Sequence, residues 1–223
     1  MSKTIEDFFY YFVYISDAVV ILLLLLFFKF TSLRLSYWIL AAYCLINTTV
    51  NVFNHQYIHL DILSNAIFTF FEYSLFSLLF YEQLKSPFFK KFILYAIIPF
   101  LLFQIFYFLN IKPQTLDSLP IAIETILILV YTFCYLYEQS NGLEKSFIYE
   151  RWHFWIATGV LIYLAGSFFI YVFADYVDIT LIEDYWFLTY GFYILKNILF
   201  IIAIFIYVHE LKTNQTPRNS ALI

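Results

Sequence analysis

The sequence predicts an all-α polytopic membrane protein in which a bundle of seven transmembrane helices forms a single domain over residues 1–223. Hydrophobic residues make up 63% of the chain and charged residues only 13%, whereas soluble domains average roughly 45 to 50% and about 25%. The apolar residues are concentrated in seven runs of about 20 residues, the length that crosses a bilayer as a helix. The run from Val19 to Phe28 is continuously apolar, which excludes the alternating pattern of a membrane β-barrel.

The predicted helices are the long stretches that lack charged residues or contain very few. In chain order they are residues 8–28, 36–53, 62–81, 92–109, 119–137, 152–174 and 185–208. We expect the first run to remain in the protein, because Glu6 and Asp7 offset Lys3 before it and no small-x-small cleavage site follows it. Residues 212–223 are polar and predict a short, disordered cytoplasmic tail.

The positive charges predict the orientation of the bundle, because short cytoplasmic loops are enriched in Lys and Arg. The opposite side has only Lys3 and Lys112. We therefore expect the N-terminus outside and the C-terminus in the cytoplasm, in a bacterial inner membrane. The cations after the first, third and fifth helices and in the C-terminal tail are Lys29, Arg34, Lys85, Lys90, Lys91, Lys145, Arg151, Lys212 and Arg218.

Composition also limits the function. Seven spans leave no segment that could house a soluble catalytic module, and a net charge of -4 without a basic cluster excludes a nucleic-acid partner. Glu72 and Ser74 are two residues apart and point to different helix faces, and His209 stands alone near the end of the last span. No catalytic constellation is recognised, so we expect neither an enzyme nor a resident cofactor.

Ionisable residues inside the spans carry most of the functional information, because charge at membrane depth is costly and usually faces the interior of a bundle. Counting ~1.5 Å per residue from the outer helix ends places Asp17, Glu72 and Lys196 roughly 15 Å deep, near the midplane. Glu124 lies a turn or more nearer the outside. Three acids and one base are therefore expected close together.

Polar residues of five predicted helices repeat at helical spacing, which puts them on one face of each helix. We expect these faces to line one cavity in the outer half of the bundle, with the lipid bilayer around it. The five sets are Tyr10, Tyr14 and Asp17; Asn47, Asn51, Asn54 and His55; Asn65, Thr69 and Glu72; Tyr163, Ser167 and Tyr171; and Thr189, Tyr193 and Lys196.

The expected layer has more negative than positive charge, and a low-dielectric setting does not tolerate that excess. Protonation of an acid, a bound cation or a small cationic ligand would balance it. A structural alternative is that Lys196 pairs with Glu72 or Glu124 and only determines the helix register. We favour a functional site, because a single ion pair would serve that purpose. Its expected residues are Asp17, Asn47, Asn51, Glu72, Glu124, Tyr193 and Lys196.

Two cofactor sites remain as minor alternatives. Lys196 at the centre of the last span matches the retinal-binding lysine of rhodopsins, with Glu72 as counterion, but Phe192 stands where microbial rhodopsins have an acid. Their helix-three Arg and helix-six Trp-x-x-Tyr-Pro pattern are also missing, so a retinal-binding, rhodopsin-like protein is a remote alternative. His55, His59 and Asp61 have a spacing that could hold zinc on a helix, and they are a weak metal candidate.

Two stretches carry a resemblance to a known group of proteins. They are residues 152–171, WHFWIATGVLIYLAGSFFIY, within the longer segment 138–174, and residues 194–200, ILKNILF. They resemble uncharacterised small seven-helix integral membrane proteins of Bacteroidetes-type bacteria. Members of this group often neighbour two-component signalling genes, so the resemblance implies a role in sensing.

These observations favour a receptor-like or sensor protein that binds a small ligand in an outward-facing polar and aromatic cavity. Because the expected inner loops are short, we expect it to signal through a separate cytoplasmic or membrane partner, such as a histidine kinase. The alternative is a proton- or cation-coupled small-molecule transporter that uses the same acids as a relay. Against transport, Pro99 and Pro120 are not at corresponding positions of two inverted halves.

Overall fold

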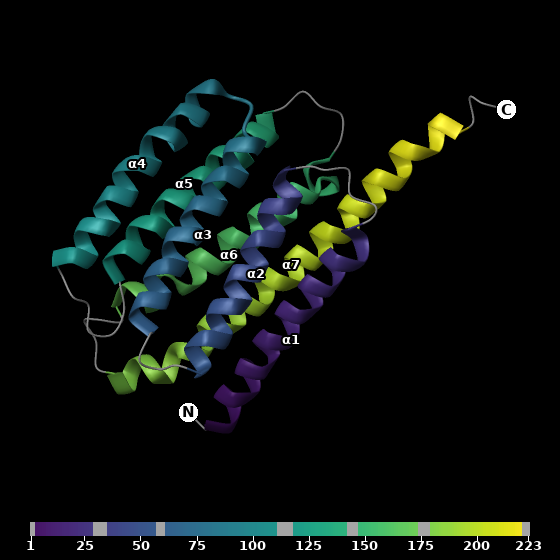
Figure 1. The fold of residues 1–223 in the computed structure, drawn as a ribbon. Helices are drawn as coiled ribbons and strands as arrows, with labels where there is room; N and C mark the ends of the chain where they lie inside the picture. Colours follow the sequence, from purple (N-terminus) through teal and green to yellow (C-terminus); the bar gives the residue numbers. More distant parts are fainter. Residues whose placement is uncertain are drawn as a thin grey trace.

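The computed structural model describes residues 3–28, 35–56, 61–110, 118–141, 147–173 and 179–219, and within these ranges the chain is almost entirely helical. Figure 1 shows long helices running side by side in one bundle. This confirms the predicted all-α fold. In chain order the elements are α1 (Lys3–Phe27), α2 (Leu35–Gln56), α3 (Asp61–Gln83), α4 (Pro87–Asn110), α5 (Ser118–Asn141), the 3₁₀ turn η3 (Ile148–Glu150), α6 (Trp152–Phe173) and α7 (Ile179–Asn219).

Six of the seven described α-helices are long and apolar enough to cross a membrane, and α3 is the exception. Polar residues such as Asn65 and Glu72 interrupt the apolar sequence of α3, and this helix packs among α2, α4 and α5. The outside of the bundle carries large apolar side chains, of which Leu25 and Leu109 are 68% and 75% exposed. Such a surface suits hydrocarbon and not water, so the chain is an integral membrane protein.

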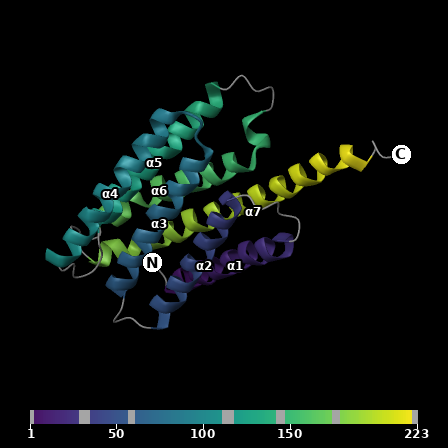
Figure 2. The same ribbon diagram turned by 45° about the horizontal axis from the view of Figure 1, so that its top comes forward.

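The helices form a closed ring of six, with α4 outside the ring. Neighbours around the ring are α1 and α2, α2 and α3, α3 and α5, α5 and α6, α6 and α7, and α7 and α1. α4 packs against α3 and α5 and lies at one edge of the bundle, as Figures 1 and 2 show from two directions. The ring encloses a central space, and α4 lies on the membrane side of its wall.

Aromatic side chains fill much of the interior between the helices. Tyr73 of α3 packs on Phe100 of α4 with ring centroids 4.1 Å apart, and Tyr43 of α2 packs on Phe76 of α3 at 4.6 Å. Aromatic pairs of this kind add about 0.5–1.5 kcal/mol beyond the burial of their area. In the interior of this bundle, Phe and Tyr therefore do much of the packing that aliphatic residues usually provide.

Several helix ends differ from the sequence expectation by about one turn or more, including the starts of α1, α4 and α7. α4 begins at Pro87 and not near residue 92, because proline suits the first turn of a helix, where no backbone N–H is required. The Glu138 carboxylate of α5 accepts hydrogen bonds from the backbone N–H groups of Lys85 and Ser86, at 2.7 and 2.9 Å, immediately before this end. The N-terminus of α4 is thereby attached to α5.

The expectation of a disordered tail is wrong for residues 212–219, because α7 continues to Asn219. Extending an existing helix avoids the unfavourable nucleation step, so a polar composition alone did not end it. Figure 1 shows that α7 projects beyond the other helices at the C-terminal end of the chain. Residues 220–223 lie outside the described ranges.

Candidate ligand-binding cavity

A cavity of about 520 Å³ lies inside the ring, within the ~300–1,000 Å³ typical of small-molecule sites. All six ring helices line it and α4 does not. The lining residues are Tyr10, Val13 and Tyr14 of α1; Asn47, Val50 and Asn51 of α2; Asn65, Phe68, Thr69 and Glu72 of α3; Ile121, Glu124 and Thr125 of α5; Tyr163, Leu164 and Tyr171 of α6; and Trp186, Thr189, Tyr190 and Tyr193 of α7.

The cavity occupies one half of the bundle. The odd-numbered helices line it with residues from their N-terminal halves, and α2 and α6 line it with residues from their C-terminal halves. This half holds the N-terminal end of the chain, opposite the projecting end of α7 (Figure 1). It is the outer half in the orientation that the positive charges predict.

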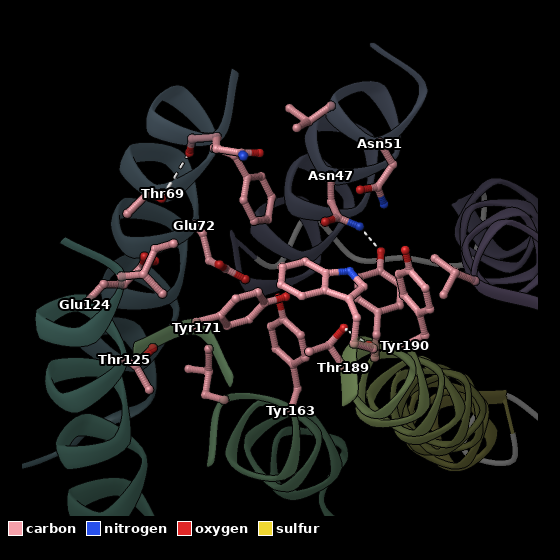
Figure 3. A pocket seen from close by; sticks show the side chains of 18 of the residues that line it. Asn47, Asn51, Thr69, Glu72, Glu124, Thr125, Tyr163, Tyr171, Thr189 and Tyr190 are labelled. Atoms are coloured by element: carbon pink, nitrogen blue, oxygen red, sulfur yellow. Dashed lines mark hydrogen bonds between the residues drawn. The ribbon is translucent and has the colours of Figure 1, made fainter. Parts of the chain in front are cut away.

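Five of the seven site residues expected from the sequence are on the cavity wall. They are Asn47, Asn51, Glu72, Glu124 and Tyr193. In Figure 3, Glu72 and Glu124 project from α3 and α5 on one side of the cavity, with Tyr163 and Tyr171 of α6 beside them. Glu72 and Glu124 are only 5% and 2% exposed, so the wall holds two carboxyl groups largely removed from bulk solvent.

Asp17 of α1 does not itself line the cavity but lies behind residues that do. Its hydrogen bonds connect three helices. Its Oδ1 accepts hydrogen bonds from the Tyr193 hydroxyl at 2.7 Å and from Nδ2 of Asn197 at 2.8 Å, both on α7. Its Oδ2 accepts a longer bond of 3.5 Å from Nδ2 of Asn51 on α2. The Tyr193 hydroxyl in turn accepts a hydrogen bond from Asn47. Asp17 thus connects α1 to two residues that line the cavity.

Lys196 also lies behind the wall and is fully buried. Its Nζ donates a hydrogen bond to the Tyr43 hydroxyl at 2.7 Å, and this hydroxyl donates to Oε1 of Glu72 at 3.0 Å. The expected pairing of Lys196 with Glu72 is therefore indirect, with a phenol between the two charges. Glu124 lines the same cavity from α5.

Aromatic rings surround the Lys196 ammonium. Nζ lies 3.8 Å from the ring centroid of Tyr193, 4.4 Å from that of Tyr163 and 4.8 Å from that of Tyr43. These distances are within the range of cation–π attraction, which is strongest at desolvated sites. The ammonium thus lies in a cluster of three tyrosines, of which Tyr163 and Tyr193 also line the cavity.

Sequence reasoning missed two residues of this network, Tyr43 and Asn197. Tyr43 lies one turn before Asn47 on the same face of α2, so extending that polar face by four residues would have found it. Asn197 follows Lys196 directly, and its amide also donates to Ser16 at 2.8 Å. No periodic signal singles out Asn197, because its bond to Asp17 depends on how α1 and α7 pack.

The minor cofactor alternatives gain no support from the geometry. Lys196 is not among the residues that line the cavity, so a retinal in this cavity would not meet its amine directly. Of the weak zinc candidate, His59 and the side chains of His55 and Asp61 lie outside the described residues, and it stays a prediction. Elsewhere in the described parts of the chain, no group of three or more His, Cys, Asp or Glu could hold a metal ion.

Asn54 likewise falls outside the described side chains, while Ser167 is buried behind the wall and donates to the Tyr163 carbonyl at 2.7 Å. The described site is thus a cavity of mixed polar and aromatic character with a buried charged network behind it. The chain matches no protein-family model, no curated protein and no solved structure.

Proposed function

We propose that this protein is a receptor-like sensor that binds a small molecule in the cavity enclosed by the six-helix ring. The observation that carries the proposal is the convergence of polar and aromatic side chains from all six ring helices on one cavity of about 520 Å³. If polar residues served only to hold neighbouring helices together, they would hydrogen-bond in pairs between those helices. Here they face a shared space that a ligand of moderate size fits.

The hydrogen bonds behind the cavity offer a route for a signal. Tyr193 contacts the cavity and also donates to Asp17, so it links the site to the contact between α1 and α7. A ligand that hydrogen-bonds to Tyr193 or Asn47 competes with these contacts, and so it biases the packing of α7. Because α7 continues to Asn219, a change in its position reaches the end of the bundle opposite the cavity.

The receiving partner is proposed to be a separate signalling protein, such as a histidine kinase, at the cytoplasmic face of a bacterial inner membrane. The orientation expected from the positive charges puts the cavity outside and the projecting end of α7 inside. The resemblance of residues 152–171 and 194–200 to proteins encoded beside two-component systems supports the same partner.

A screen of small molecules against the purified protein tests ligand binding. We expect at least one compound to raise the unfolding temperature in detergent, because a bound ligand adds about 2.7 kcal/mol at a hundredfold excess over its Kd. Val50 lines the cavity, so Val50→Phe should occupy the space and abolish the shift. Val52 lies on the outside of the same helix and is 40% exposed, so Val52→Phe is the matched control and should keep it.

Two results would count against the sensor. If no compound shifts the wild type, or if Val50→Phe leaves the shift unchanged, the cavity is not a ligand site. The second candidate, a proton- or cation-coupled transporter, is favoured by the buried chain of ionisable groups that runs from Glu72 through Tyr43 to Lys196. Flux of the bound compound into proteoliposomes, dependent on a pH or cation gradient, would favour it over sensing.

A further inference from the structure

The charged residues described on the cavity wall are all acidic. Among the described residues, the lining includes the carboxyl groups of Glu72 and Glu124 and no lysine, arginine or histidine. Both acids are almost fully buried, so neither is screened well by water. A ligand that enters this space meets acceptors and carboxylates from α3 and α5 without a competing cation on the wall.

Among the described residues, the buried side chains include more acids than cations. Lys196 is the one fully buried cation among the described residues, and Asp17 and Glu72 both lie in its hydrogen-bonded surroundings. Asp17 is bound by neutral donors, namely the Tyr193 hydroxyl and the Asn197 amide. The buried charged residues that the structure describes are thus one cation and three acids, and an additional positive charge in the cavity is electrostatically favoured.

The remaining walls suit the body of an organic cation. Tyr171, Trp186 and Tyr190 present aromatic rings to the cavity, and Phe68, Ile121 and Leu164 present apolar surface. The protein already holds one ammonium, that of Lys196, against the rings of Tyr163 and Tyr193, at 4.4 and 3.8 Å. Rings arranged in this way attract cations through the negative faces of their π systems.

We propose that the ligand of this cavity is an organic cation, whose ammonium group binds near Glu72 and Glu124 while its apolar body lies against the aromatic and aliphatic wall. Figure 3 shows the two carboxyl side chains projecting from neighbouring helices on the same side of the site. The asparagines of α2, Asn47 and Asn51, lie at another part of the cavity and supply hydrogen-bonding groups for a polar end. This inference rests on the proposed ligand-binding function and specifies its chemistry.

Matched series of compounds test the charge requirement. Each series has one body and three end groups, as in 2-phenylethylamine, 2-phenylethanol and 3-phenylpropanoate, and we use three bodies of increasing size: propyl, phenylethyl and indolylethyl. The amine of at least one series should raise the unfolding temperature of the wild type in detergent at neutral pH. The alcohol and the carboxylate with the same body should do so weakly or not at all.

Carboxyl-to-amide variants test which carboxyl groups bind the amine. Glu72→Gln and Glu124→Gln preserve side-chain shape, and each should weaken amine binding by about 30-fold or more, because a buried charge partner is lost. Glu150 is exposed in η3, so Glu150→Gln changes the net charge equally and should leave binding unaffected. If Glu72→Gln does not fold, Glu124→Gln and the comparison of end groups on the wild type still decide the question.

The possible failures are distinguishable. If amine, alcohol and carboxylate bind equally and Val50→Phe blocks all three, the cavity is a ligand site but the cation requirement is wrong. If the carboxylates bind best, the ligand is an anion and the inference is wrong. If no series shows a difference between end groups and the screen of small molecules also finds no ligand, both this inference and the proposed function fail.

Discussion

At the scale of single residues, the notable feature is an ammonium group buried without a direct carboxylate contact. The Lys196 side chain is fully buried, and its charge is compensated through the Tyr43 hydroxyl and three aromatic rings. The Tyr43 hydroxyl accepts one hydrogen bond from the ammonium and donates one to the Glu72 carboxyl group, so it links the two groups and separates them. Removing one charge of such a pair leaves the other buried and unbalanced, which is strongly destabilising.

Replacing Lys196 tests this account. Lys196→Met keeps the length of the side chain and removes the charge, and it should lower the free energy of unfolding by about 3 kcal/mol, because Glu72 loses its compensating charge. Denaturation of the purified protein in mixed micelles measures the change. Lys91 is exposed near the start of α4, so Lys91→Met is the matched control and should change stability by less than about 0.5 kcal/mol.

The double variant Lys196→Met with Glu72→Gln separates coupling from lost packing. If the two charges interact through Tyr43, the double variant should be more stable than the sum of the two single effects predicts, by about 0.5–3 kcal/mol. Strictly additive effects would mean that Lys196 and Glu72 contribute independently, and the proposed link through the phenol would then be wrong.

At the scale of secondary-structure elements, the contact between α6 and α7 depends on two glycines one heptad apart. A Cβ atom added at Gly166 would lie 2.5 Å from the ring of Phe192, and one added at Gly159 would lie 3.3 Å from the backbone oxygen of Lys196. Small residues let membrane helices approach closely. This close approach holds the part of α7 that bears Tyr193 and Lys196 against α6.

Adding a methyl group at this contact should push the helices apart. Gly166→Ala should lower the free energy of unfolding by about 1–3 kcal/mol, as overpacking does in other cores. Gly191 has no atom within 4 Å of its added Cβ, so Gly191→Ala is the matched control and should be neutral or stabilising by up to about 1 kcal/mol through helix propensity. Thermal unfolding in detergent measures both.

A second substitution at Phe192 tests whether its ring causes the loss of stability expected for Gly166→Ala. The second substitution Phe192→Leu removes part of the ring that meets the new methyl group, so it should restore some of the stability lost in Gly166→Ala. A Gly166→Ala protein as stable as the wild type would show that α6 and α7 do not pack as closely as the structure describes.

At the scale of the whole molecule, the order of the helices and the charges at their ends predict the orientation of the bundle in the membrane. Lys85 and Arg151 lie at the end of the bundle where α3 and α5 finish, and Lys212 lies on α7 as it leaves the other helices. The cations counted in the sequence predict that this end lies in the cytoplasm. The cavity, in the opposite half, would then open toward the outside.

Reporter fusions test the orientation directly. Green fluorescent protein fused after Arg218 should be fluorescent, and alkaline phosphatase fused at the same position should be inactive, because the first works in the cytoplasm and the second in the periplasm. The same two reporters fused after Asn110, at the other end of α4, should give the opposite result. Phosphatase activity after Arg218 would invert the bundle and place the cavity on the cytoplasmic side.

Much of the fold was predictable from the sequence, for a local reason. The seven helices follow from apolar runs, which are properties of contiguous residues. The largest differences are at helix ends: α1 begins at Lys3, α4 begins at Pro87, and α7 extends from Ile179 to Asn219. The polar helix faces were also predictable, since helical spacing alone puts Tyr10 and Tyr14, or Asn47 and Asn51, on one side of a helix. Four of the seven expected site residues, Asn47, Asn51, Glu72 and Tyr193, line the cavity for this reason. Glu124, the fifth that lines it, was expected as a charged residue within a span.

By itself, then, the sequence determined which segments are helices and which of their faces are polar. Only the tertiary structure decided that six helices close into a ring with α4 outside, that Asp17 and Lys196 lie behind the cavity wall, and that Tyr43 stands between Lys196 and Glu72. The reason is physical: the order and rotation of packed helices depend on side-chain contacts between segments far apart in the chain, such as Gly166 on Phe192. No local pattern in the sequence specifies those contacts.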